Sequence, residues 1–102
     1  DATGIKIILG ANRPAEAEIE VYFRTANDGQ VLSDQFWVQA TTLNSPAPTN
    51  DKTLFRDYEY LAGGNEGTLT SFTEFQVKVV FRSTNEAKVP VVRDLRAIAL
   101  ID

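Results

Sequence analysis

Two pairs of carboxylates have the spacing that acid–base chemistry would need. Asp57 and Glu59 are two positions apart, as are Glu18 and Glu20, and on a strand this spacing places both members of a pair on one face. The sequence contains no His and no Cys, so the commonest general base and a thiolate nucleophile are both missing. A solvated acidic face explains the pairs more simply, because charged strand faces are common. We therefore expect no enzymatic activity.

Loop carboxylates and amides offer the oxygen ligands that calcium prefers. Asn27, Asp28 and Asp34 lie around an Asp-Gly turn signal, and Asn50-Asp51 lies in a second polar stretch. Their spacing does not match a calcium-binding loop, and Asn-Asp-Gly is far more common as a plain turn. The glycine-rich stretch at residues 62–70 does not match a phosphate-binding motif either. We expect no metal and no cofactor.

The most informative polar cluster is the tetrad Arg93-Asp94-Leu95-Arg96, which interrupts an otherwise apolar segment. Charges inside such a segment are costly to bury unless they are paired. Arg56 and Asp57 lie in the similarly charged FRDYEY segment, and the expected partners are Asp57, Glu59 or the tetrad's own charges. We predict a buried ion-pair network that fixes strand register, and a marked loss of thermal stability on Arg96→Ala. The alternatives are a ligand site, or an edge that docks against another chain.

Four aromatic side chains are candidates for carbohydrate recognition. Small β-sandwiches often present aromatic and amide groups on a face or at loop ends, and the residues available here are Trp37, Tyr22, Tyr58 and Tyr60. The same residue types are expected in the core of a β-rich protein. Carbohydrate binding is therefore the alternative function.

These side chains must be positioned by strands, because hydrophobic residues alternate with polar ones along much of the chain. The clearest alternation places Phe75, Val77, Val79 and Phe81 on one face. Residues 16–24 alternate in the same way; AEAEIE also suits a helix, but the following VYFRT favours a strand. Other strands are expected at residues 4–10, 35–39 and 53–61, and a surface loop at 41–52. The prediction is an all-β domain, an antiparallel β-sandwich of jelly-roll type with about six to seven strands and no substantial helix.

Residues 72–101 hold two long strands, which we expect to pair through a polar turn at Ser83-Thr84-Asn85-Glu86. The second strand, from residue 91, is apolar on both faces, and such strands are usually covered on both sides. We therefore expect it to lie centrally in its sheet or against another chain, with FRDYEY as its neighbour.

Bulk properties predict one globular domain over residues 1–102. The chain is 43% hydrophobic and carries a formal net charge of -4 without a Lys/Arg cluster, so we expect no nucleic-acid partner. No apolar run approaches the roughly 20 residues of a membrane span, and we expect no membrane partner. Because the sequence begins with Asp1 and contains no Met, we expect a processed chain or a fragment of a longer protein.

A family resemblance is carried by VYFRT at residues 21–25, FRDYEY at 55–60 and FQVKVVFRSTNEAKVPVVRDLRAIAL at 75–100. These segments resemble a β-sandwich domain of tailed-bacteriophage structural proteins, found in tail, baseplate and fibre-associated proteins of contractile-tailed phages, cyanophages included. The shared pattern is an aromatic-Arg strand, Phe-Arg-x-Tyr-x-Tyr, Phe-Gln-x-Lys-x-Val, a Ser/Thr-Asn turn, Pro90 and a terminal Asp-Leu-Arg-x-Ile-Ala-Leu.

This resemblance implies a virion location and a non-enzymatic structural role. The domain would work through protein–protein contacts with other virion proteins in an oligomeric assembly, and the resemblance supplies no catalytic residues. Such segments often end longer virion proteins, in agreement with the expected fragment. The alternative is a carbohydrate-binding module that recognises a host-surface glycan. An exposed aromatic platform would favour the glycan, whereas buried aromatics and an apolar patch would favour assembly.

Overall fold

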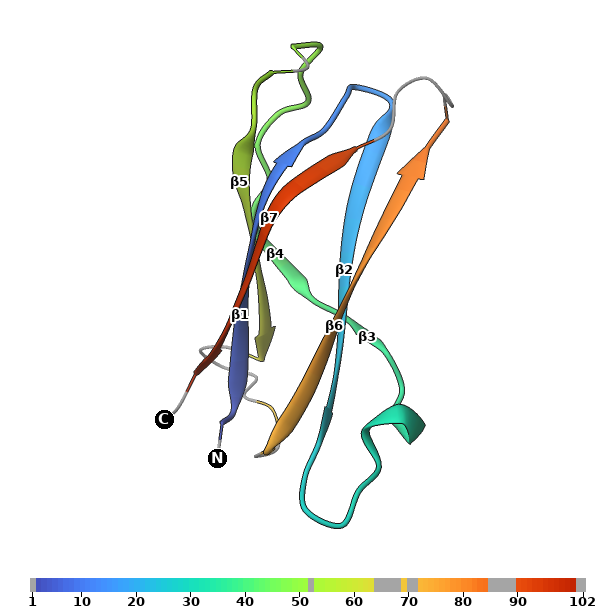
Figure 1. Ribbon diagram of the computed structural model, residues 1–102, viewed down its shortest axis with the longest axis vertical. Helices are drawn as coiled ribbons and strands as arrows, with labels where there is room; N and C mark the ends of the chain where they lie inside the picture. The colour runs from blue at the N-terminus through green and yellow to red at the C-terminus, as the bar shows by residue number, and fades with distance from the viewer. Residues whose placement is uncertain (1, 52, 64–68, 70–71, 85–89, 101–102) are drawn as a thin grey trace.

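The chain folds into two antiparallel sheets. The computed structural model describes residues 2–51, 53–63, 69, 72–84 and 90–100. Within these residues the one helical element is a 3-10 turn, η1 (Leu32–Asp34), and the sheets lie face to face (Figure 1). The seven strands are β1 (Gly4–Asn12), β2 (Ala17–Ala26), β3 (Val38–Gln39), β4 (Thr41–Asn44), β5 (Arg56–Gly63), β6 (Glu74–Ser83) and β7 (Val91–Leu100). The predicted all-β fold class is confirmed.

One sheet has four strands in the order β4-β5-β1-β7, and the other has three in the order β3-β2-β6. The chain passes between the sheets several times: β1 and β2 lie in different sheets, and so do β3 and β4. The molecule is elongated along its strands, with extents of 45 × 25 × 20 Å. In Figure 1 the edge strands β6 and β7 lie at the front of the molecule.

β1 is the centre of the core because strands flank it on both sides and the second sheet covers one face. Its inward side chains Ile5, Ile7 and Leu9 are fully buried. Burial of each contributes on the order of 1.5–3 kcal/mol. On β5 the residues opposite them in register are Ala62, Tyr60 and Tyr58, which are also buried. The apolar run at residues 4–10 is thus a strand, as predicted.

β2 is a strand and not a helix, as its alternating pattern predicts. Val21 and Phe23 are buried against the core while Glu18 is exposed. β2 pairs with β6 over ten positions, from Ala17 opposite Ser83 to Ala26 opposite Glu74. The turn after β2 contains Gly29 with φ of 86°, a left-handed conformation that glycine adopts at little cost.

The expected pairing between the last two long strands is wrong. β6 pairs with β2 and β7 pairs with β1, so the two strands lie in different sheets. β7 is an edge strand rather than a central one, and β1 separates it from the FRDYEY strand β5. Its two apolar faces have separate causes: Leu95 lies opposite Leu9 on the core side, and Ile98 lies opposite Lys6 on the outer side.

The predicted loop at residues 41–52 is wrong in its first third. Thr41–Asn44 forms β4, which pairs with β5 as an exposed edge strand, and threonine's β-branched side chain suits this position. Of the expected strand at 35–39, only Val38–Gln39 forms a strand, and it pairs with β2. Most of the glycine-rich stretch at 62–70 and half of the turn at 83–86 lie outside the described residues.

Candidate functional site

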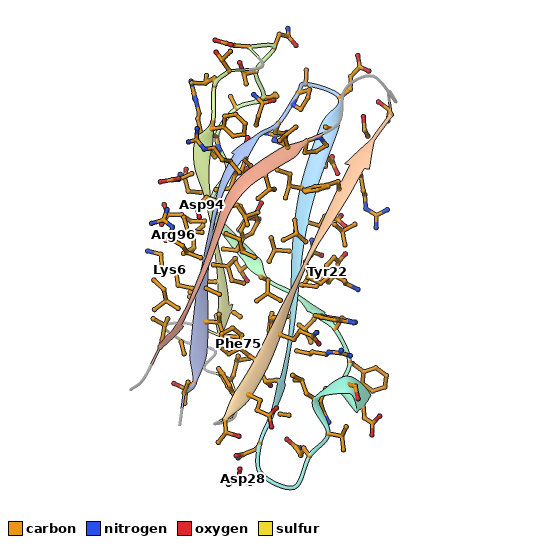
Figure 2. All side chains as sticks on the ribbon, viewed as in Figure 1. Lys6, Tyr22, Asp28, Phe75, Asp94 and Arg96 are labelled. Atoms are coloured by element: carbon orange, nitrogen blue, oxygen red, sulfur yellow. The ribbon has the colours of Figure 1, made fainter. Side chains whose placement is uncertain are left out.

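Two charges of the tetrad, Asp94 and Arg96, lie on the outer face of the four-stranded sheet. In register, Asp94 and Asp57 flank Gly10 from opposite sides, and glycine places no side chain between them. Arg96 Nε lies 3.4 Å from Asp94 Oδ2, and its Nη2 lies 3.9 Å from Asp57 Oδ1. Figure 2 shows Arg96, Asp94 and Lys6 along this outer side.

This charged cluster is not buried, and the expectation that it would be is wrong. More than half of the surface of each side chain, Asp57, Asp94 and Arg96, is exposed. The reason is that the second sheet covers only the inner face, and β7 is an edge. Exposed pairs of this kind contribute about 0–1 kcal/mol each, so they do not anchor the register.

The other two arginines named with this cluster have different surroundings. Arg93 lies where the β1–β7 register shifts, and its guanidinium is 4.6 Å from the centroid of the Phe55 ring, a cation–π contact. Arg56 is exposed opposite Ala11 and forms no ion pair with any described residue. A cation that the sequence did not single out, Lys6, binds Glu59 at 3.2 Å across β1 and β5.

Two of the four candidate glycan-binding aromatics are buried. Tyr58 and Tyr60 are buried on the inner face of β5, opposite Leu9 and Ile7, so the expectation that they face a glycan is wrong. Burial, with a smaller contribution from the Tyr58 hydroxyl, raises the pKa of Tyr60 to about 12. Tyr58 and Tyr60 share a face because they are two residues apart on a strand, and the packing of the two sheets makes this face the inner one.

Trp37 and Tyr22 lie at the surface but do not form an open aromatic platform. Both are partly buried. The Arg24 guanidinium lies 4.3 Å from the centroid of the Trp37 ring and the Lys78 ammonium lies 4.5 Å from it. Lys78 is also 5.3 Å from the Tyr22 ring. A sugar that stacks on the Trp37 ring would therefore compete with two cations that already lie over it.

Three of the four paired carboxylates make ordinary surface contacts. Glu20 accepts hydrogen bonds from Arg82 Nε at 2.9 Å and from the Tyr22 hydroxyl at 3.0 Å. The Arg82 bond, followed by the Tyr22 bond, lowers the pKa of Glu20. A general acid needs a raised pKa, so Glu20 is poorly suited to that role. On the other pair, Asp57 and Glu59 lie beside Arg96 and Lys6.

Two of the candidate calcium ligands, Asn27 and Asp51, use their side-chain oxygens in turns. The Asn27 side chain accepts the Asp28 N–H at 2.9 Å. Asp51 Oδ1 accepts the N–H of Thr53 at 2.9 Å and its hydroxyl at 2.6 Å, and these bonds lower the pKa of Asp51. Among the described residues no group of three or more Asp and Glu side chains could hold a metal ion.

Two residues just after the β1 core contacts hold neighbouring loops in place, and sequence reasoning missed both. Asn12 is buried, and its Nδ2 donates to the carbonyls of Asp51 at 2.9 Å and Leu54 at 2.7 Å. Arg13 donates to Pro46 O at 2.9 Å and to Ala17 O at 3.3 Å. A pocket of about 280 Å³ beside Arg13 is also lined by Glu18, Glu20, Gln39, Ser45, Tyr58 and Tyr60.

Exposed apolar side chains are concentrated at the strand edges and around η1. β7 contributes Val91, Leu95 and Ile98, and the edge strand β6 contributes Phe81. The second group lies between η1 and β4 and includes Phe36, which is 91% exposed. An edge strand also has backbone N–H and C=O groups that no neighbour pairs with. Among the described strands β7 has a neighbour on one side only, so it combines an open edge with exposed apolar side chains, the combination that supports β-strand addition.

No helix in the described part of the chain is long and apolar enough to cross a membrane. Comparison of the chain with protein-family models, with curated proteins and with solved structures found no match. The resemblance to phage structural proteins therefore depends on the three sequence segments alone.

Proposed function

We propose that this chain is a non-enzymatic assembly module of a phage tail, baseplate or fibre, which works through contacts with other virion proteins. The observation that carries the contact role is β7: a ten-residue strand at a sheet edge with Val91, Leu95 and Ile98 about half exposed. The virion setting comes from the sequence resemblance, whose longest segment, residues 75–100, includes this strand.

Because β7 lies at a sheet edge and exposes apolar side chains, contact with a protein partner is more favourable for it than contact with water. A long exposed edge strand is a template for pairing with another chain, and proteins that avoid such pairing shorten or cover it. β4, on the opposite edge of the same sheet, has only four residues. β7 is longer and carries three large apolar side chains at the surface. The asymmetry between the two edges of this sheet supports β7 as the contact strand.

Carbohydrate recognition is the weaker proposal. Of the four aromatics considered for it, Tyr58 and Tyr60 are in the core, and Trp37 lies beneath Arg24 and Lys78. A glycan-array screen of the purified domain tests it directly. Clear binding that Trp37→Ala abolishes would promote carbohydrate recognition over assembly.

Hydroxyl-radical footprinting of the free domain and of intact particles that carry the chain tests the assembly function. Protection of Leu95 and Ile98 in the particle is the expected result, because a neighbouring protein would exclude water from both. Leu9, which is fully buried in the free domain, is the internal control and should react weakly in both samples. Equal oxidation of β7 in the two samples would refute the proposal.

A further inference from the structure

The regular part of β7 has a self-complementary charge pattern. From Asp94 to Leu100 the strand keeps an unbroken register with β1, so its side chains alternate strictly between two faces. Asp94 and Arg96 share the outer face with Ile98 and Leu100, and Leu95 lies between them on the core side. A strand that carries one acid and one base, evenly placed around a central residue, can pair with an identical antiparallel strand through both charges.

We propose that β7 forms a two-fold interface with β7 of a second copy of this chain, with Leu95 of each copy at the axis. In this register Asp94 of each copy lies directly opposite Arg96 of the other, so two opposite-charge pairs form on the outer face. Directly opposite side chains have Cβ atoms about 4.5–5.5 Å apart, within reach of an ion pair. The inference rests on the proposed assembly function and names its partner.

The joined sheet could also form with the two-fold axis at a neighbouring residue. The registers that keep the outer faces of both copies on one side of the joined sheet are less favourable than the one centred on Leu95. An axis at Asp94 sets the two Asp94 side chains opposite each other, and an axis at Arg96 does the same for the two arginines. Like charges directly opposite destabilise a strand pair. An axis at Ala97 sets Asp94 opposite Leu100 and Arg96 opposite Ile98, which leaves no charge pair. Charge complementarity thus selects Leu95.

Pairing in this register also covers apolar surface. Leu95 is 48% exposed, and at the axis it would lie against Leu95 of the second copy. The two four-stranded sheets would join into one continuous sheet, in which the unpaired N–H and C=O groups of both β7 strands find partners. Arg96 can exchange its present partners for Asp94 of the second copy, because both of its ion pairs are exposed and have N–O distances of 3.4 and 3.9 Å.

Disulfide cross-linking tests the register, since the sequence contains no Cys. Leu95→Cys would place two thiols at the axis, with Cα atoms within the roughly 4.4–6.8 Å that a disulfide requires. Ile98→Cys is the matched control: Ile98 is 50% exposed, but the two copies would hold it about 20 Å apart, at roughly 3.3 Å per residue. A covalent dimer of Leu95→Cys alone is expected under mild oxidation. Equal cross-linking of both variants, or of neither, would overturn the proposal.

Charge reversal tests the ion pairs. Asp94→Arg and Arg96→Asp each set like charges opposite one another, so sedimentation should show the dimer dissociation constant raised at least about tenfold for either variant. An equimolar mixture of the two variants restores both attractive pairs and should dimerise again. Arg82→Asp on β6 is the control, and it should dimerise like the unaltered protein. Circular dichroism checks that each variant is folded. A mixture that stays monomeric would contradict the inference.

The outcomes separate this inference from the assembly function. A domain that is monomeric in solution, with β7 covered by a different protein in the particle, overturns the second-copy interface and leaves the assembly function standing. A Leu95-specific dimer of a chain that is not a component of any particle supports the interface and overturns the virion role.

Discussion

Replacing Leu9 by Ala should destabilise the domain far more than the same replacement at Leu95, although the two side chains are direct neighbours. They lie opposite each other on β1 and β7, on the same face of the same sheet. Leu9 is 0% exposed and Leu95 is 48% exposed. The pair therefore compares a central strand that the second sheet covers with an edge strand whose leucine is half exposed.

The expected cost at Leu9 has two parts. Leu→Ala removes three carbon atoms from water-free surroundings, worth about 2.4 kcal/mol at roughly 0.8 kcal/mol each. A cavity is left in a packed core and adds to the cost, and the total should be about 3 kcal/mol. For a 102-residue domain, this lowers the melting temperature by roughly 12–24 °C.

Leu95→Ala should lose about half of this transfer free energy, because half of the side chain is already exposed, and it leaves no enclosed cavity. The expected loss is about 1 kcal/mol, or a few degrees in melting temperature. Urea unfolding of both variants at low protein concentration measures the two free energies of unfolding. Low concentration matters because association through β7 would add to the apparent stability. Equal losses at Leu9 and Leu95 would show that Leu9 is no more deeply buried than Leu95.

Three further predictions concern single side chains. Arg96→Ala should lower the free energy of unfolding by less than about 1 kcal/mol in thermal denaturation, because its ion pairs are exposed; a marked drop would restore the buried-network hypothesis. Asn12→Ala should cost about 1–3 kcal/mol by urea unfolding, since two carbonyls lose a buried donor, whereas Asn44→Ala, whose bond is exposed, should cost little. The pKa of Tyr60 is near 10.0 in the unfolded chain and about 12 in the folded protein. Between these two pH values unfolding releases a proton, so the free energy of unfolding should fall by about 2 kcal/mol across this alkaline range. Tyr60→Phe should remove that fall. If the variant kept the same pH dependence of its free energy of unfolding, Tyr60 would not be its cause.

Local pattern predicted the strands themselves with good accuracy. The two-residue alternation around Val21 and Val77 marks β2 and β6, and a run bracketed by glycines marks β1. β4 was missed because four exposed residues beside prolines carry no hydrophobic period. Asn12 and Arg13 were missed because a buried loop anchor has the same residue type as an ordinary turn residue.

The sequence by itself determined that the chain is all-β and which residues share each strand face, because side-chain direction follows from the two-residue repeat of a strand. Only the tertiary structure decided that β6 and β7 belong to different sheets and that β7 lies at an edge. Strand neighbours are chosen by contacts between residues far apart in the chain, such as Leu9 with Leu95. An apolar strand has the same local pattern whether this chain or a second copy covers it, so its burial depends on which strands the fold places beside it.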